Sequence, residues 1–251
     1  MHALLVAAVG LTSAQGPAAR ATLGWINEFV VAEHLCPWAR EASSGPGFRL
    51  TVVEDLAEFE AQAVRDAGWL NDRDVTPEKS TALIVLSGSA TQPSVAAFGH
   101  TCTHVAKHQA LDGLDLLGFH PQRIDTGPGC SADPEDAAHF SVRSPLPLIQ
   151  LLRQDELMRV RRAWKATHRS SLPGALELLH GNKRRLRTIG SASLRARFDS
   201  LRSRGARSGD VRMGVVVDGA EDLEAALFTC CLVGAAYFSG YASEGYEPHR
   251  L

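Results

Sequence analysis

Cys36, His120 and Arg143 are the residues whose types and contexts best suit chemistry, and each stands within two residues of a proline. A thiol can act as a nucleophile, an imidazole as a general base, and a guanidinium as a clamp for an anionic group. These are the parts that covalent thiol catalysis on a small anionic substrate needs. The sequence therefore predicts, as a first hypothesis, a thiol-dependent enzyme in which the three side chains converge.

Cys36 precedes Pro37 in the segment HLCPWAR. Proline is common at the first position of a helix, so this spacing predicts that Cys36 is an N-cap. Backbone N–H groups and the positive end of the helix dipole would then stabilise its thiolate and lower its pKa. Cysteine is also among the most buried residue types, and the alternative is an inert thiol that fills a turn between two helices.

His120 ends an apolar strand in the segment LGFHPQ. The carboxyl ends of strands in an open α/β sheet deliver the loops that form sites, so His120 is predicted to be a base or a residue that orients one. The alternative is a histidine that caps the loop by hydrogen bonding, and the pattern leaves both interpretations open.

Arg143 heads the segment RSPLP, just before a helix that we predict to begin at Pro147. The guanidinium and the helix N-terminus would then converge on one anion. The alternative is a salt bridge to the acid-rich loop that precedes Arg143, which offers Asp133, Glu135 and Asp136.

The elements that must position these residues alternate between strand and helix. Apolar runs predict strands over 48–53, 81–88 and 114–119, and helical periodicity covers 18–35, 55–70 and 93–110. Strands joined by helices of this length indicate a small, mainly parallel sheet with crossover helices, which is an α/β fold. A Gly- and Pro-rich segment over 122–144 predicts a long irregular loop. A helical region follows from Pro147 to about Ser203.

The organisation predicted along the chain has four parts. Residues 1–17 form a leader or an extra strand, 18–150 the α/β core, 151–207 a basic helical region packed on the core, and 208–251 a C-terminal extension. The extension contains a predicted edge strand over 213–219. It also contains an uncharged stretch over 225–242, which is either a buried helix or a membrane segment, and its length is at the lower limit for a span.

Composition places the chain among ordinary globular proteins, with 251 residues, 45% of them hydrophobic and 22% charged. The five cysteines are an odd number and include no C-x-x-C spacing, which argues against zinc ribbons and thioredoxin-type sites and favours a reducing compartment. No phosphate-binding or dinucleotide-binding glycine motif is present. We therefore expect no cofactor.

We also expect no metal. His100, His104 and His108 share one helical face, but Val95, Phe98, Cys102 and Val105 form the apolar stripe on the opposite face, so the histidines should point to solvent.

Charge is divided unevenly along the chain. The formal net charge is −2, yet 153–207 holds 15 Lys or Arg and four acids, a local net of +11. Such a segment can bind a polyanion, and a non-enzymatic binding or assembly protein that uses it is the second hypothesis. It can also lie against acidic parts of the same chain. Because aromatic residues are few in it and no recognition motif is present, nucleic-acid binding is disfavoured.

Three of these segments together resemble the family known as domain of unknown function 1415. They are HLCPWAR after an amphipathic first helix, LGFHP at a strand end, and RSPLPLIQLLR; the later GNKRRLRTIGSASL is similar to the closing helix of the family. The resemblance covers about Ala18 to Leu201. It maps the following residues onto family motif positions: Cys36, Pro37, Arg40, His120, Pro121, Arg143, Ser144, Pro145, Pro147 and Arg153.

The resemblance implies a site but no reaction, because the family carries no established activity to transfer. From the mapped motif we expect Ser144 and Arg40 to join Arg143 in binding the substrate. AHFSV over 138–142 departs from the family pattern by losing an acid and two amides, so we expect any ligand binding through those groups to be altered or lost in this chain.

Overall fold

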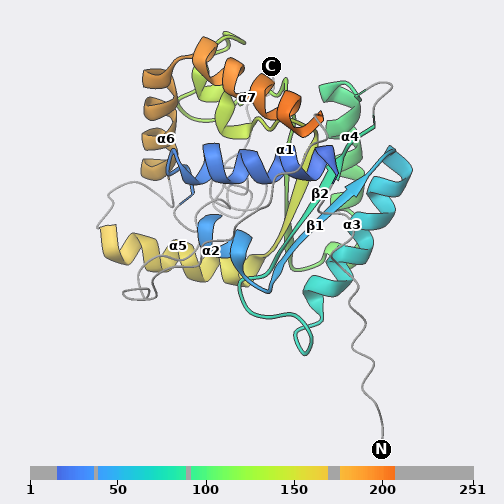
Figure 1. The fold of residues 1–251 in the computed structure, drawn as a ribbon. Coiled ribbons are helices and arrows are strands. Elements are labelled where there is room, and N and C mark those ends of the chain that lie inside the picture. The colour runs from blue at the N-terminus through green and yellow to red at the C-terminus, as the bar shows by residue number, and fades with distance from the viewer. Residues whose placement is uncertain (1–15, 37–38, 89–91, 169–175, 207–251) are drawn as a thin grey trace, which may run out of the picture.

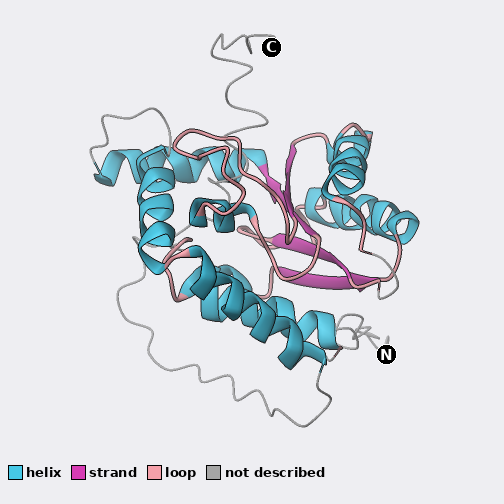
Figure 2. Cartoon of the chain, turned by 90° about the horizontal axis from the view of Figure 1, so that it is seen from above, coloured by secondary structure: helices cyan, strands magenta, loops and turns pink. Residues whose placement is uncertain are grey.

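A four-stranded sheet lies between two layers of helices (Figures 1 and 2). The computed structural model describes residues 16–36, 39–88, 92–168 and 176–206. The sheet order is β1-β2-β4-β3. The strands are β1 (Phe48–Val53), β2 (Thr81–Leu86), β3 (Leu114–Phe119) and β4 (Leu148–Arg153).

The helices begin where local signals favour them. Pro17 opens α1, and the side chains of Asp55 and Ser94 accept hydrogen bonds from backbone N–H groups in the first turns of α3 and α4. The α-helices are α1 (Pro17–Trp25), α2 (Ala39–Ser44), α3 (Leu56–Asn71), α4 (Val95–Ala106), α5 (Gln154–His168), α6 (Leu176–Ile189) and α7 (Ser191–Ala206). The shorter elements are a π-helical turn η1 (Ile26–Val31) and two 3-10 turns, η2 (Gln109–Leu111) and η3 (Ala137–Val142).

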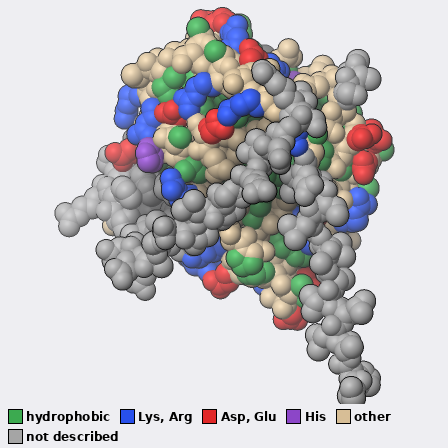
Figure 3. Space-filling view, in the orientation of Figure 1, with side chains coloured by type: hydrophobic (Ala, Val, Ile, Leu, Met, Phe, Trp, Pro, Cys, Tyr) green, Lys and Arg blue, Asp and Glu red, His purple; other side chains and the backbone are tan. Residues whose placement is uncertain are grey.

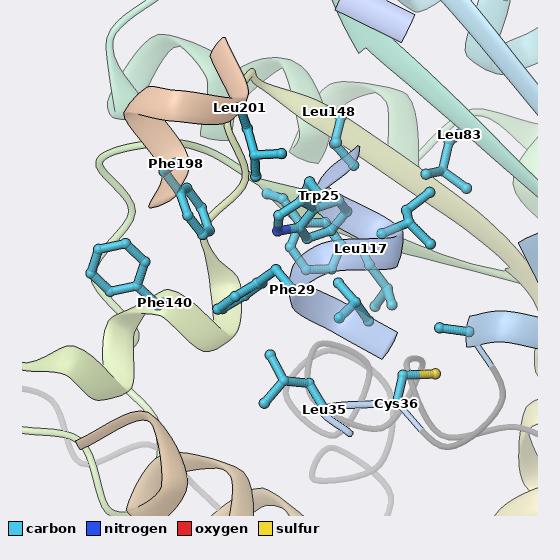
Figure 4. Packing of buried hydrophobic residues seen from close by; sticks show 14 of the residues in the cluster. Trp25, Phe29, Leu35, Cys36, Leu83, Leu117, Phe140, Leu148, Phe198 and Leu201 are labelled. Atoms are coloured by element: carbon cyan, nitrogen blue, oxygen red, sulfur yellow. The ribbon is translucent and has the colours of Figure 1, made fainter. Parts of the chain in front are cut away.

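Two apolar cores lie on opposite faces of the sheet. One packs α3 and α4 against the sheet around Phe59 and Phe98. The other packs α1, α7 and parts of α5 and α6 around Phe29, Phe198 and Leu201, and Figure 4 shows part of it. Side chains alternate between faces along a strand, so β4 serves both cores: Leu148 and Leu152 face the α1 side, and Ile149 and Leu151 face the α3 side.

The predicted helix beginning at Pro147 is wrong, because the segment 148–153 is a strand in the middle of the sheet. Strand β4 pairs with β2 on one edge and with β3 on the other. Its apolar run LIQLLR is compatible both with the apolar face of a helix and with a strand that is buried on both faces. The segment forms a strand because β2 and β3 hydrogen-bond to it on its two sides. Helix α5 begins only at Gln154.

The α/β class is confirmed, but the sheet is mixed. Strands β1 and β2 are parallel, and β4 is antiparallel to both β2 and β3. The reversal places the start of β4 beside the end of β3, with Leu148 opposite Phe119. As a result, the turn that precedes β4 and the loop that follows β3 leave the sheet at the same end of these two strands. This brings the RSP and HPQ segments together, although 20 residues of chain separate them.

Several predictions concern residues outside the described part of the chain, namely the segment before residue 16, the edge strand over 213–219 and the apolar stretch over 225–242. Within the described residues, no helix combines the length and apolar character needed to cross a bilayer. The loop predicted over 122–144 is irregular apart from η3, whose first turn is capped by Asp136.

Candidate functional site

A pocket of about 460 Å³ opens at the end of the sheet where β3 finishes and β4 begins. Pro121 and Gln122 line it from the loop after β3, and Arg143, Ser144 and Pro145 line it from the turn before β4. Helix α7 and the loop before η3 close it on the other sides. Two segments of the family motif therefore contribute walls to one cavity.

The walls of this pocket divide into a charged part and an apolar part. The apolar part includes Phe140 and Phe198, whose rings meet edge to face with centroids 5.0 Å apart (Figure 4). Ile124 and three prolines extend that part. The charged part consists of three arginines and two acids, namely Arg143, Arg195, Arg202, Glu135 and Asp199.

Arg143 is held rigidly by the backbone. Its Nε donates to the carbonyl of Arg123 at 2.9 Å and its Nη2 to the carbonyl of Pro134 at 3.0 Å. The guanidinium also lies over the ring of Phe140, 5.0 Å from the centroid. These contacts fix the direction in which the guanidinium meets the pocket.

The charge of Arg143 has no carboxylate partner among the described residues. The residue is only 7% exposed, and its guanidinium makes no ion pair in that part of the chain. Burial lowers the pKa of Arg143, and the nearby positive charge of Arg195 lowers it further. A buried cation that faces a second cation is costly unless an anion compensates it. The pocket is therefore a candidate anion site.

The two other arginines of the pocket are paired with acids on its rim. Arg195 binds Glu135, and Arg202 binds Asp199 along α7. All four side chains are about half exposed, so these pairs are screened by solvent and contribute little to stability. Breaking either pair would therefore cost little.

Ser144 also lines the pocket and is fully buried. Its hydroxyl donates to the carbonyl of Leu146 at 2.5 Å, which stabilises the turn into β4. Arg40, the third predicted ligand, is exposed on α2 and is not among the residues that line the pocket. The structure thus brings Ser144, but not Arg40, to Arg143.

His120 stands next to the pocket and makes two hydrogen bonds with the backbone. Its Nδ1 accepts from the N–H of Gln122 at 3.2 Å, so Nε2 carries the proton and donates to the carbonyl of Pro93 at 3.0 Å. Burial lowers the pKa of His120, which favours this neutral form. Its ring packs against Phe98 in the core on the α3 side. A role as base would require one of these bonds to break.

Cys36 lies in the other core. It is 4% exposed and clusters with Leu35 and Ala39 on the α1 side of the sheet (Figure 4). Helix α2 begins at Ala39 and has six residues, and residues 37 and 38, on which the N-cap prediction depends, lie outside the described residues. Cys36 and His120 therefore belong to different cores, and neither lines the Arg143 pocket.

The helix N-terminus that was predicted to share an anion with Arg143 does not exist, since β4 follows the turn. The alternative interpretation, a salt bridge of Arg143 to the acid-rich loop, is not observed either. Arg143 binds a carbonyl of that loop, while the carboxylates of Glu135 and Asp136 pair with Arg195 and Arg187.

The three histidines on α4 and after it do not form a cluster. His104 lies 3.5 Å from a carboxylate oxygen of Glu60, and Nδ1 of His108 accepts from the N–H of Ala110. Over the described ranges, no three His, Cys, Asp or Glu side chains stand close enough to hold a metal ion.

A buried cluster that the sequence analysis did not single out lies under the loop before η3. The Lys183 ammonium, on α6, binds the Asp125 carboxylate at 3.0 Å and the carbonyl of Pro128 at 2.7 Å. The Cys130 thiol, which is partly exposed, interacts with both charged groups. No local pattern predicts this pairing, because 58 residues separate Lys183 from Asp125. The cluster anchors the loop that carries Glu135.

The basic segment is largely neutralised by acidic residues. Eight of its described basic residues make ion pairs, and six of these pairs reach acids outside the segment. Figure 3 shows Lys and Arg side chains interspersed with Asp and Glu on the face where α1 and α7 lie. The uneven charge along the sequence is thus mixed in space.

Burial predicts the order in which the cysteines react. Burial raises the pKa of Cys102 to about 12, which lowers its thiolate fraction about a thousandfold relative to an ordinary cysteine. Cys36 is shielded in its core, whereas Cys130 is partly exposed. In protein with Cys230→Ser and Cys231→Ser, iodoacetamide at about pH 8 should therefore modify Cys130 first. Peptide mass spectrometry over time measures the order.

Urea-unfolded protein is the control for this experiment, because all three thiols should then react at similar rates. Rapid modification of Cys36 in the folded protein would contradict the prediction and show that solvent reaches this thiol.

The fold and the pocket define an α/β protein with a candidate site for a small anion. The family described as Protein of unknown function (DUF1415) matches residues 18–195, and the chain belongs to this family. No curated protein and no solved structure shows a significant match to the chain.

Proposed function

We propose that this protein binds a small anionic molecule in the Arg143 pocket. The observation that carries the proposal is a guanidinium that is 7% exposed, lines a cavity and has no carboxylate partner in the described structure. A planar guanidinium held in one orientation suits a carboxylate or phosphate group. An anion bound there would supply the countercharge that Arg143 lacks.

The size and the walls of the pocket agree with a small organic ligand. A volume of about 460 Å³ falls in the range of small-molecule sites, about 300–1,000 Å³. Ile124, which is 41% exposed, and three prolines offer apolar surface beside the charged part. The ligand would place its anionic group at Arg143 and its apolar body against this surface.

Arg143→Met tests the proposal. Titration calorimetry at low salt, with inorganic phosphate and benzoate as probes, should show affinity that falls about tenfold to a hundredfold in this variant, as expected for the loss of a charge-assisted hydrogen bond. Arg143→Lys should bind with intermediate affinity, because it keeps the charge but not the planar fork.

Arg184→Met is the matched control, since Arg184 is exposed on α6, lies outside the pocket, and its removal costs the protein the same charge. Arg195→Met, on the rim, covers the case in which Arg143→Met does not fold. Equal affinity in wild-type, Arg143→Lys and Arg195→Met proteins, or an equal loss in Arg184→Met, would reject the site.

Thiol-dependent chemistry through Cys36 and His120 has weaker support. Neither side chain lines the pocket, and the two lie in separate cores. Both ring nitrogens of His120 are hydrogen-bonded to backbone groups. Our proposal keeps from the thiol-enzyme hypothesis only its small anionic ligand and assigns no role in binding to Cys36. Cys36→Ala should therefore leave the affinity for phosphate unchanged.

Polyanion binding by the basic segment also has less support than the pocket. Ion pairs with acids outside the segment oppose the accumulation of positive charge that phosphate backbones attract. Filter binding to RNA or DNA across a salt series would detect such a function by a steep loss of affinity with salt.

A further inference from the structure

The charged part of the Arg143 pocket contains three arginines but only two acids, so its formal charge is +1. Arg202 has its own partner, Asp199, three residues earlier on α7. Among the described residues, one carboxylate lies near the remaining arginines, Arg143 and Arg195. It is that of Glu135, which pairs with Arg195 and acts on Arg143 only through its charge. Two guanidiniums therefore share one carboxylate.

The Glu135 side chain is placed to leave this position without disturbing the site. It is 64% exposed, so its pair with Arg195 is screened by water. Its backbone is held separately, because its N–H donates to the Asp133 carboxylate at 2.9 Å. The neighbouring carbonyl of Pro134, which fixes Arg143, would stay in place when the side chain swings out.

We propose that the ligand is a phosphate monoester, that its dianionic head binds between Arg143 and Arg195, and that it displaces the Glu135 carboxylate. This inference rests on the proposed function. A phosphate monoester carries close to two negative charges at neutral pH and matches two guanidiniums, whereas a monocarboxylate or a phosphodiester carries one. The organic group of the ester would lie against Ile124 and the prolines of the pocket.

Glu135 then acts as a competitor built into the site. In the free protein it partly neutralises Arg195, and the ligand must replace it to reach both arginines. A ligand with a single charge gains too little to displace it. Glu135 would thus set the preference of the pocket for dianions.

The experiment compares three probes of similar shape, namely phenyl phosphate, methyl phenyl phosphate and benzoate, by titration calorimetry at low salt. Phenyl phosphate should bind about tenfold or more tightly than the other two, because only its head carries the second charge. Its affinity should also rise between about pH 5 and about pH 7.5, as the second phosphate proton with a pKa of about 6 is lost. Benzoate should show no such rise.

Glu135→Gln tests the displacement step. Removing the competing carboxylate should strengthen phenyl phosphate binding about threefold to tenfold. Glu28→Gln is the matched control, because it removes one negative charge from an exposed arginine pair of α7, that with Arg204, which does not line the pocket. It should change the affinity less than twofold.

Each outcome bears on one of the two proposals. Equal affinity for phenyl phosphate and either of the other two probes would overturn the monoester assignment while leaving an anion site. Weaker or unchanged binding in Glu135→Gln would overturn the displacement. If the wild-type protein binds none of the probes, or if Arg143→Met binds them as tightly, the proposed function itself fails, and this inference fails with it.

Discussion

Replacing Arg153 with Met should lower the free energy of unfolding by about 3–5 kcal/mol, the range expected when one partner of a buried ion pair is removed. Arg153 ends β4, is 2% exposed, and pairs with Glu156 at 2.9 Å. Its guanidinium also donates to three backbone carbonyls, those of Leu70, Thr76 and Pro77. Methionine fills part of the volume but leaves these acceptors and the Glu156 carboxylate buried without their donor. Chemical denaturation at neutral pH measures the loss.

Arg204→Met is the control for this prediction. Arg204 also pairs with a carboxylate, that of Glu28 at 2.6 Å, but both side chains are about half exposed. An exposed pair contributes about 1 kcal/mol or less. Similar losses in the two variants would show that burial does not decide the contribution of Arg153.

Lys183→Met should also lower the free energy of unfolding by about 3–5 kcal/mol near pH 7, and the loss should depend on pH. Burial raises the pKa of Asp125, but the hydrogen bond and charge of Lys183 outweigh it and hold this pKa below its ordinary value. In the wild-type protein, Asp125 therefore contributes stability above the unfolded pKa of about 3.9, and this contribution is lost as the pH falls through the folded pKa.

The variant should show the opposite dependence. Without the ammonium, burial dominates and raises the pKa of Asp125 above its unfolded value, so the carboxyl costs least when it is protonated. The difference in stability between Lys183→Met and the wild-type protein should thus shrink from about pH 7 to about pH 4. Denaturation curves across that range give the comparison.

The double variant Lys183→Met/Asp125→Asn is the control, because it removes both charges. It should be more stable than Lys183→Met near pH 7 and should lose the pH dependence that arises from Asp125. A difference between Lys183→Met and the wild-type protein that stays constant from pH 7 to pH 4 would show that Asp125 is not coupled to Lys183.

Local patterns in the sequence account for much of the fold. Strand-like apolar patterns place β1 and β3 at their observed bounds, and the continuous apolar run over 81–88 places β2 within two residues. The first helix is predicted as one α-helix, but its second half is the π-helical turn η1, for which the sequence shows no breaker.

The candidate site is only partly predictable from the sequence. Arg143 and Ser144 stand in a local motif and are expected together, and both line the pocket. The pairing of Arg195 with Glu135 carries no local signal, because 60 residues separate the two. They meet only because α7 packs beside the loop before η3.

The sequence by itself determines the α/β class, the family and the segments that hold Arg143 and His120, because apolar periodicity and short motifs are local properties. Only the tertiary structure decides that 148–153 is a strand, since its apolar run satisfies helix and strand alike until β2 and β3 offer hydrogen bonds on both edges. Because this strand is antiparallel to β3, the segments that hold His120 and Arg143 lie at the same end of the sheet. The tertiary structure also places Cys36 in the core on the α1 side and packs the His120 ring against Phe98 of the core on the α3 side, so the two side chains do not meet at one site.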